Sequence, residues 1–345
     1  MHIGVIGGGV SGLAFSIEAQ RFGLDVAVID RGEPSPQLGE VLEATAKYPL
    51  QRLGVYEEFV REQTPLSGRR ARWGTTIVRE SSTIFSPHGA DWLLDKSKFE
   101  QCLRDRAIST GVRYQVGHVI TACRRSEKWF VKLRSGERNV FDFLVDATGR
   151  VMWLTRRLGL KPIVIDHLVA VSLYYRTRDS SPVFDIESAA EGWWYRAPLQ
   201  KGRTLLMLLT DRDLIPRDIK KSARLTRLGS FSELVNGPVR AAHSAYVRSD
   251  VRLGWAAVGD AALARDPLSG QGIKAAIDSA ILLAQTLKRL KQGEDGVAHA
   301  YSRVADSTIQ NYIVDRVKAY SSEQRWDSFP FWQRRHNSQE VLNVQ

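Results

Sequence analysis

Three glycines near the N-terminus have the spacing of a phosphate-binding turn. Gly7, Gly9 and Gly12 form a GxGxxG pattern between the apolar run IGVI and a helix-like stretch. In such a turn the first glycine permits a tight bend, the second lets a pyrophosphate approach the backbone, and the third allows close packing of helix on strand. Asp30 ends a second apolar run, DVAVID, where a carboxylate binds a ribose. These residues predict a dinucleotide site, for which NAD and FAD are both open.

A second glycine-bearing stretch, GWAAVGDAALARDPLSGQG, begins at residue 254 and decides between the two. Its WAAV is expected to be a strand that runs into Gly259 and Asp260, and DPLSGQG a loop that leads into a helix. A dehydrogenase that uses NAD alone needs no second cofactor-binding segment so far along the chain. FAD does need one, because its long ribityl chain and its ring must also be held. The cofactor predicted is therefore FAD. The expected core face of the helix consists of Ile273, Ala276, Ile277, Ala280, Ile281, Ala284 and Leu287.

The stretch GDAALARDPLSGQG resembles the second FAD-binding motif of flavoprotein hydroxylases of the aromatic-hydroxylase fold. The resemblance implies that Asp260 contacts the ribityl or pyrophosphate oxygens and that Pro267 lies by the flavin face. It also implies that backbone amides at the start of the helix stabilise negative charge on the reduced ring. The FAD contacts implied in this stretch are Gly259, Asp260, Pro267, Ser269, Gly270 and Gly272.

Two intermediate segments agree with this assignment. The segment 91–112 has Phe99, Leu103 and Ala107 on one helical face, and relatives of this fold carry a basic or amide side chain against FAD where this chain has Lys96. The alternative for Lys96 is an ordinary surface lysine. The segment VFDFLVDATGR, which contains Gly149, resembles the strand and ATG element that packs near the FAD adenosine.

Residues 37–59 resemble the segment of flavin-dependent halogenases and geranylgeranyl-reductase-like proteins that places Gly39 and Glu40 near the flavin. Halogenases also carry a WxWxIP motif and a lysine that captures hypohalous acid. This chain has GWWYRAP, in which Tyr195 and Ala197 replace a tryptophan and the isoleucine, and GRRARWGTT over 68–76 offers no lysine. These departures count against halogenation. The DG motif of NAD(P)H-dependent hydroxylases is replaced by DATG, which leaves a separate flavin reductant open.

The combination of LGEVLEAT, ARWGT, LDKSKFE, GWWYRAPL, ARDPLSGQG and RWDSFPFWQRR is most similar to the flavoprotein maturases of quinoprotein oxidases. The resemblance implies an FAD-dependent monooxygenase that oxygenates a tryptophan of a precursor protein during formation of cysteine tryptophylquinone. Hydroxylation or halogenation of a small aromatic molecule and a non-catalytic, FAD-holding chaperone are the alternatives. Glu40 and Asp266 are the candidate catalytic acid or base, because both are expected near the flavin.

Composition restricts the remaining possibilities. The chain has 345 residues, 43% of them hydrophobic, and no apolar run approaches the ~18 residues of a membrane helix, so a cytoplasmic protein is expected. Cys102 and Cys123 suit neither a disulfide framework nor a metal site. The net charge of +11 gathers at 69–72, 216–227 and 333–335, and no nucleic-acid motif accompanies it. The partner expected is a precursor oxidase with an acidic docking surface.

The predicted fold class is α/β, a Rossmann-like FAD-binding domain with an inserted antiparallel β-sheet domain on the substrate side. The FAD-binding domain is expected to comprise residues 1–150 and 251–293, the inserted domain 151–250, and a helical tail 294–345. LVAVSLYYRT, GWWYRAPL and RTLLMLLTD are the expected strands of the insertion. In the tail, Val304, Ile309, Tyr312, Ile313 and Val317 recur at helical spacing. The tryptophans are expected mainly in packing roles.

Overall fold

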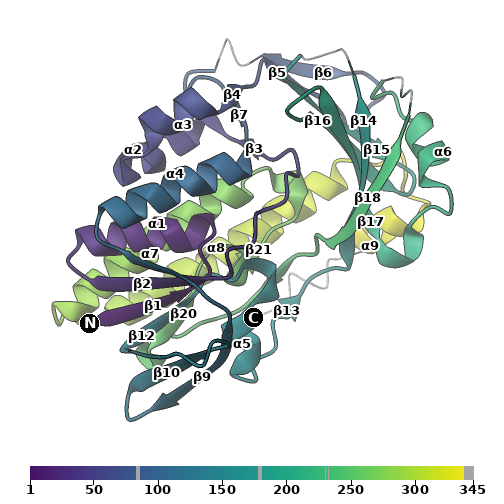
Figure 1. The fold of residues 1–345 in the computed structure, drawn as a ribbon. Helices are drawn as coiled ribbons and strands as arrows, with labels where there is room; N and C mark the ends of the chain where they lie inside the picture. The colour runs from purple at the N-terminus through teal and green to yellow at the C-terminus, as the bar shows by residue number, and fades with distance from the viewer. Residues whose placement is uncertain (83–85, 178–180, 230, 232, 338–345) are drawn as a thin grey trace.

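A five-stranded parallel sheet forms one half of the protein (Figure 1). The computed structural model describes residues 1–345 except 83–85, 178–180, 230, 232 and 338–345, so the end of the predicted tail lies outside the described residues. The sheet has β1 at its centre, and its order is β20 (Trp255–Ala257), β12 (Phe143–Asp146), β1 (His2–Ile6), β2 (Asp25–Asp30) and β8 (Arg113–Val116). Every pair in it is parallel, which confirms the Rossmann-like class.

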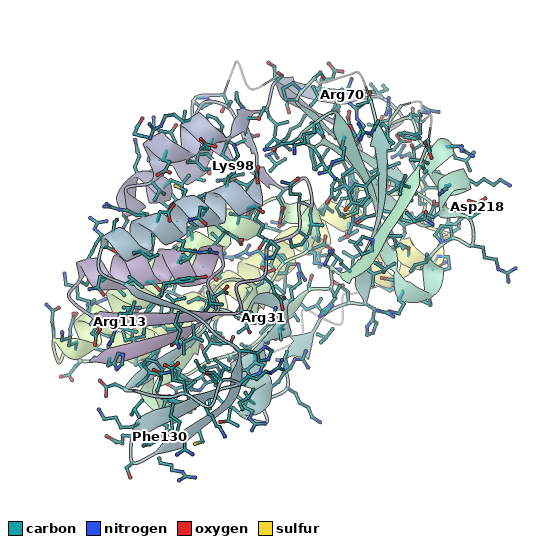
Figure 2. All side chains as sticks on the ribbon, viewed as in Figure 1. Arg31, Arg70, Lys98, Arg113, Phe130 and Asp218 are labelled. Atoms are coloured by element: carbon teal, nitrogen blue, oxygen red, sulfur yellow. The ribbon has the colours of Figure 1, made fainter. Side chains whose placement is uncertain are left out.

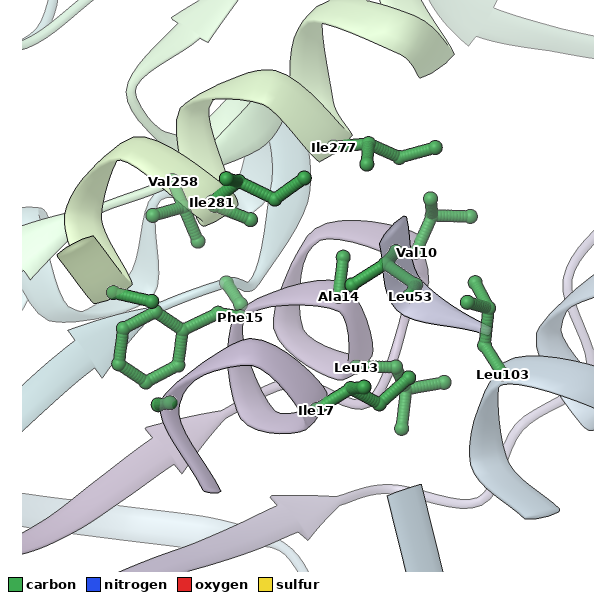
Figure 3. Close-up of a cluster of buried hydrophobic side chains, with 14 of the residues drawn as sticks. Val10, Leu13, Ala14, Phe15, Ile17, Leu53, Leu103, Val258, Ile277 and Ile281 are labelled. Carbon is green, nitrogen blue, oxygen red and sulfur yellow. The ribbon is translucent and has the colours of Figure 1, made fainter. Parts of the chain in front are cut away.

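Three helices, α1 (Val10–Arg21), α4 (Lys96–Ser109) and α7 (Gly272–Lys291), cover one face of this sheet. Helix α1 is buried over its first ten residues because it lies between the sheet and the other two helices. Figure 3 shows Ala14 and Phe15 of α1 beside Ile277 and Ile281 of α7, with Leu103 of α4 at the side. Each such buried Leu, Ile or Phe contributes about 1.5–3 kcal/mol. The predicted core face of α7 is confirmed from Ile277 onward, as is that of α4.

A small antiparallel sheet covers the opposite face. It consists of β9 (Val119–Arg125), β10 (Lys128–Leu133) and β11 (Arg138–Phe141), and the short helix α5 (Trp153–Arg157) lies beside it. Trp129 of β10 is fully buried, and its indole Nε1 donates to the backbone oxygen of Gly254 over 2.7 Å. This bond ties the small sheet to the start of β20.

The other half of the protein is a seven-stranded sheet. Its order is β18 (Val235–Ala241), β14 (Leu168–Arg176), β17 (Arg203–Asp211), β16 (Gly192–Pro198), β15 (Val183–Ala189), β5 (Gly68–Arg72) and β6 (Arg79–Ser82). Only the β5–β15 pair is parallel. The three predicted strands are β14, β16 and β17. The sheet also takes β5 and β6 from the first 150 residues, and the division of the chain into domains stays a prediction.

Strand β16 divides its aromatic side chains between the two faces of this sheet. Trp193 and Tyr195 pack with Tyr320 and Trp332 on one face, and Trp194 packs in a separate core on the other. Trp193, Trp194 and Trp332 are fully buried, and Trp73, Trp92 and Trp326 are half-buried. The tryptophans whose exposure could have served docking therefore pack inside the fold.

The tail forms α8 (Val297–Ser321) and α9 (Pro330–His336), and α8 lies beside α7. The proline of FPFW begins α9 at its first helical position, where no backbone N–H is needed. The remaining elements are short: β3 (Val41–Leu42), α2 (Lys47–Leu53), α3 (Tyr56–Glu62), β4 (Thr64–Pro65), β7 (Trp92–Leu93), β13 (Ile163–Val164), α6 (Ile219–Arg224), β19 (Ala245–Tyr246) and β21 (Leu263–Ala264).

Candidate functional site

The first glycine loop connects β1 to α1, and its three glycines meet different surroundings. Gly7 has φ +107°, and a Cβ added there would lie 2.4 Å from the backbone oxygen of Ala147. A Cβ on Gly12 would lie 2.1 Å from the Gly7 oxygen, so packing alone excludes a side chain at either position. A Cβ on Gly9 would meet only Glu100 Oε1, at 3.7 Å. Gly9 thus faces open space, as a turn that admits a pyrophosphate requires.

Asp30, at the end of β2, holds this loop in place. Its Oδ2 accepts a hydrogen bond from the Gly8 N–H over 2.6 Å, and its Oδ1 accepts one from the Gly32 N–H over 2.7 Å. A Cβ on Gly8 would lie 2.8 Å from the Asp30 Cβ, so residue 8 must also be glycine. Each carboxylate oxygen keeps a second lone pair. The ribose contact of Asp30 stays a prediction.

The second glycine-bearing loop lies directly against the first. Gly259, in a 3-10 turn after β20, has φ +60°, and a Cβ there would lie 2.6 Å from Ser11 Oγ in the first turn of α1. Its N–H donates to Ser279 Oγ of α7 over 2.9 Å. The next residue, Asp260, forms an ion pair of 3.3 Å with Arg150. Segments about 250 residues apart therefore meet at the same helix terminus.

Three other predicted glycines, Gly149, Gly270 and Gly272, leave their surroundings open. An added Cβ on Gly149 or Gly272 would meet no atom within 4 Å, and one on Gly270 would meet only Arg69 Nη1, at 3.9 Å. Gly149 begins a 3-10 turn after β12, whereas Gly272 begins α7. Together with Gly9, Gly149 and Gly272 leave room for a ligand to approach the backbone, whereas the Gly270 N–H already donates to the Pro267 oxygen over 3.0 Å.

An ion pair joins Glu40 to Lys96 beside the first loop, with 3.2 Å between Oε1 and Nζ. Burial lowers the pKa of Lys96, but the carboxylates of Glu40 and Glu100 outweigh this effect, so the pKa is raised and the ammonium stays charged. Glu100 lies one turn further along α4 and is buried, and burial is the main reason that its pKa is raised. Among the described residues, the second carboxylate oxygen of Glu40 is buried without a hydrogen-bond donor.

Strand β16 holds the segment that carries Glu40. The Tyr195 hydroxyl donates to the backbone oxygen of Leu38 over 2.7 Å. Gly39 has φ +63°, and a Cβ there would lie 2.4 Å from the Cβ of Ala197. The two residues that depart from the halogenase motif thus contact Leu38 and Gly39, the two residues that precede Glu40.

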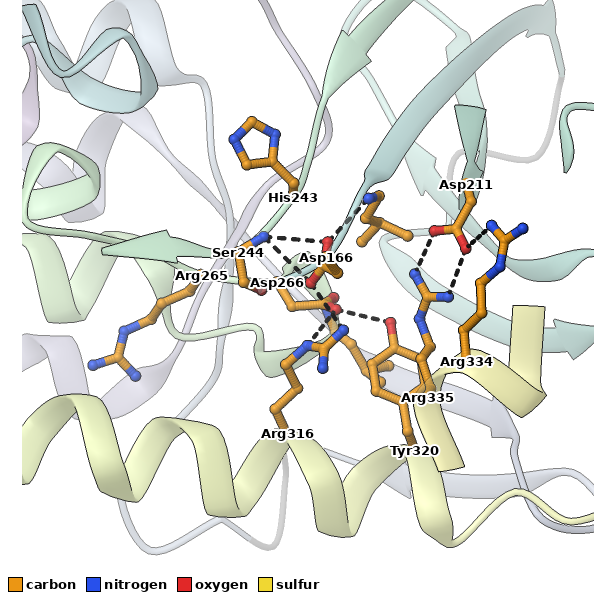
Figure 4. A network of polar contacts seen from close by, with 12 residues as sticks. Asp166, Asp211, His243, Ser244, Arg265, Asp266, Arg316, Tyr320, Arg334 and Arg335 are labelled. Atoms are coloured by element: carbon orange, nitrogen blue, oxygen red, sulfur yellow. Dashed lines mark hydrogen bonds and ion pairs between the residues drawn. The ribbon is translucent and has the colours of Figure 1, made fainter. Parts of the chain in front are cut away.

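Asp266 lies in a buried polar network (Figure 4). Its Oδ1 accepts from the Leu268 N–H over 2.9 Å, which caps the turn Pro267–Ser269. Its Oδ2 accepts from the Tyr320 hydroxyl over 2.8 Å and lies 3.4 Å from Arg316 Nε. Burial raises the pKa of Asp266, and the Arg316 guanidinium opposes this effect. The contacts of Asp266 link the turn to α8, and its role as acid or base stays a prediction, like that of Glu40.

The residues of the candidate site fit FAD. Gly9, Gly149 and Gly272 leave space for a ligand, and Glu40 keeps a buried oxygen without a donor. The FAD contacts of the individual residues stay predictions. When bound, FAD supplies electron transfer and activation of oxygen, while Lys96 and the loop amides can hold its anionic groups.

Gly8, Glu100, Arg69 and Arg150 also belong to the site but were not among the predicted residues. The spacing of Glu100 from Lys96, four residues on one helix face, was a usable signal. Nothing local indicated that Arg69 would reach Gly270 or that Arg150 would pair with Asp260, because these pairs are distant in the sequence. The described residues contain no group of three His, Cys, Asp or Glu side chains suited to a metal ion. No helix in the described part of the chain is long and apolar enough to cross a membrane.

Fold and site define an FAD-dependent oxidoreductase, and comparison with known proteins identifies its family. The profile of the tryptophan halogenase family matches residues 67–344, so the chain belongs to this family. It is 30% identical over 96% of both chains to LodB of Marinomonas mediterranea, which is described as a putative FAD-dependent oxidoreductase. It is 26% identical to 1H-pyrrole-2-carbonyl-[peptidyl-carrier protein] brominase of Pseudoalteromonas luteoviolacea over 84% of this chain and 78% of that protein.

Solved structures share the fold. The peptidyl tryptophan dihydroxylase QhpG, described as essential for tryptophylquinone cofactor biogenesis, matches with a TM-score of 0.77 and 24% identity. The match covers 96% of this chain and 78% of QhpG. The flavin-dependent halogenase CmlS matches with a TM-score of 0.82 and 22% identity over 97% of this chain and 67% of CmlS. These matches confirm the expected resemblance to the flavin-dependent hydroxylase and halogenase fold.

Replacing Lys96 tests the predicted contact of its ammonium with FAD. Lys96→Met leaves Glu40 and Glu100 without their cation beside an anionic cofactor, so we expect the Kd for FAD to rise by about ten- to a hundredfold. Titration of apoprotein with FAD, followed by quenching of flavin fluorescence, measures the change. Lys98→Met is the matched control, because Lys98 lies on the same helix and is exposed in a pair with Glu62 (Figure 2). Equal affinities of the two variants would remove Lys96 from the site.

Proposed function

We propose that the protein is an FAD-dependent monooxygenase that hydroxylates a tryptophan side chain of a precursor protein. This reaction would serve the formation of cysteine tryptophylquinone in an amine or amino-acid oxidase. Similarity to LodB over nearly the full length and to the fold of QhpG supports the proposal. QhpG is described as a peptidyl tryptophan dihydroxylase, and this description gives the substrate class of the proposal.

The observation that favours hydroxylation over halogenation is an arginine beside the second glycine-bearing loop. Arg69 of β5 lies 3.9 Å from the position of a Cβ on Gly270 and pairs with Asp91 over 2.9 Å. Residues 68–76 contain no lysine. Because arginine stays protonated in proteins, it cannot provide the neutral amine that captures hypohalous acid in halogenases.

The proposed reaction balances with one molecule of oxygen and an external reductant. Each hydroxylation inserts one oxygen atom into a C–H bond of the indole ring, and the second atom leaves as water. Two electrons and two protons are needed, and a reduced nicotinamide, acting directly or through a separate flavin reductase, is the donor class. The protein's part is to bind FAD, to exclude water and to hold the indole near the ring.

A basic segment on α6 is the proposed docking site for an acidic oxidase. The arginines at 69–72 and 333–335 are neutralised by ion pairs within the fold's own surface and core, such as Arg70–Asp185 and Arg335–Asp211. By contrast, the exposed cations Arg217, Lys221 and Arg224 form no ion pair within the described residues. Figure 2 shows this segment at the edge of the seven-stranded sheet, where Asp218 is labelled.

Co-expression with a candidate precursor oxidase from the same operon tests the proposal. We expect the intact mass of the precursor to gain one or two oxygen atoms, located by peptide mapping on a tryptophan. An equal amount of a variant that cannot hold FAD, Gly9→Val, serves as the control and should give no gain. Stable association without added oxygen would instead support the chaperone. Oxygen or halogen on a free small aromatic, with the precursor unchanged, would support the small-molecule enzyme.

A further inference from the structure

A cavity of about 510 Å³ lies between α7 and α8, and the proposed function makes no use of it. Gly272, Ala275 and Ala276 of α7 form one wall, Ala305 and Ile309 of α8 form the facing wall, and Leu263 of β21 forms part of the floor. Figure 1 shows the two helices side by side above β21. The lining is mostly apolar.

The cavity exists because short side chains face each other across the gap between the helices. Interiors of proteins are close-packed, and voids larger than a water molecule are few. A concave, mostly apolar space of this size lies within the range of small-molecule sites. Val304, which helical spacing placed among the apolar positions of the tail, lines the cavity and is 45% exposed. Packing between the two helices does not account for the exposure of Val304.

The cavity lies apart from the first glycine loop. It touches the predicted FAD site only at Gly259 and Gly272, and its lining does not include Gly9, Asp30 or Lys96. The part shared with the predicted FAD site is thus limited to the second loop and the start of α7. We therefore expect that FAD and a ligand in the cavity can be bound at the same time.

One cation in the cavity lacks a carboxylate partner. Three carboxylates line the cavity, and all are paired: Asp306 with Arg248, Asp278 with Lys274, and Asp250 with Arg252. Arg265 also lines the cavity, but within the described residues no carboxylate lies at ion-pair distance from it, and its guanidinium stacks over the Tyr312 ring at 5.2 Å.

The orientation and burial of Arg265 agree with the lack of a carboxylate partner. Figure 4 shows its side chain directed away from the Asp266 network that neutralises Arg316. Burial lowers the pKa of Arg265, and the ring of Tyr312 and more distant carboxylates only partly offset this effect. A half-buried guanidinium without a partner is a ready site for an anionic group.

We infer that this cavity binds a small organic monoanion with an apolar body, such as an aromatic carboxylate, whose charged group pairs with Arg265. The alanines of α7 and α8 leave room for a flat ring, and the guanidinium fork accepts a carboxylate in two parallel hydrogen bonds. This site is additional to the predicted FAD site. The inference does not depend on whether the substrate of the enzyme is a protein.

Calorimetric titration of the FAD-loaded protein with 2-naphthoate and with its neutral isostere 2-naphthamide tests the inference. We expect naphthoate to bind at least about tenfold more tightly. Arg265→Gln should abolish this preference, and Arg303→Gln, which changes an exposed arginine of α8 outside the cavity, should leave it intact. Ala305→Phe should weaken both ligands by filling the space. FAD content and melting temperature verify that each variant is folded.

Three results would overturn the inference. The first is equal affinity for the two ligands, and the second is a preference for naphthoate that survives Arg265→Gln. The third is binding that occurs only in protein stripped of FAD, because the ligand would then occupy the flavin groove. None of these results depends on the monooxygenase activity, so failure here is distinguishable from failure of the proposed function.

Discussion

Gly9→Val is expected to give a folded protein that no longer holds FAD. The backbone at residue 9 is extended, with φ −78° and ψ −174°, which any residue adopts without strain. An added Cβ meets only Glu100 Oε1, at 3.7 Å, so the empty protein tolerates the side chain. The isopropyl group would occupy the space that a pyrophosphate needs, and we expect the Kd for FAD to rise at least about a hundredfold.

Two measurements on the purified variant separate binding from folding. Flavin absorbance per protein reports FAD content, and thermal unfolding of the apoprotein reports stability, which should stay close to that of the parent apoprotein. Gly12→Ala is the contrasting variant, because its Cβ would lie 2.1 Å from the Gly7 oxygen and must displace α1. It should lose both stability and FAD. A yellow, stable Gly9→Val protein would show that the cofactor does not pass over this loop.

Asp266→Asn is expected to destabilise the protein by about 3–5 kcal/mol, because it leaves the buried Arg316 with only part of its compensating charge. Both side chains are almost completely inaccessible, at 1% and 5% exposure. Asp166 still pairs with Arg316, over 2.8 Å. Urea unfolding monitored by circular dichroism measures the loss. Asp315→Asn, one residue from Arg316 and exposed, should change stability little.

The same variant distinguishes the two roles open to Asp266. A positioning role, in which the carboxylate holds Pro267–Ser269 against α8, predicts that stability and FAD affinity fall together. A role as acid or base predicts normal stability and FAD content with loss of product only. The second pattern would show that burial of this carboxylate serves chemistry rather than the loop.

The parts of the site that sequence analysis predicted are those whose requirements are local. A glycine spacing, the strand before it and the acid after it are neighbours in the chain. The structure places Gly7 and Gly12 where backbone atoms exclude a side chain, and Gly259 where the Ser11 side chain does. The three strands of the insertion were predicted from continuous apolar runs. In each case the sequence signal lies within one element or at its ends, although the atoms that exclude a side chain at Gly7 and Gly259 belong to distant segments.

The contacts that were not predicted from the sequence join distant segments of the chain. GRRAR has no apolar pattern, yet it forms β5, because Arg70 and Arg72 lie opposite Asp185 and Glu187 in a parallel pair with β15. The basic cluster at 69–72 is thus largely a neutralised ladder, not a free patch. Likewise, no local pattern shows that Asp266 meets Tyr320 and Arg316 of a helix some fifty residues later.

The contact of Gly259 with Ser11 also bears on how the protein is made. A ribosome releases the first loop early, but the segment that completes its surroundings emerges about 250 residues later, followed by α7. The nascent chain therefore cannot close the groove until most of it has been synthesised. Cofactor loading must be a late event, and chains cut short before α7 should leave the ribosome unable to retain a flavin.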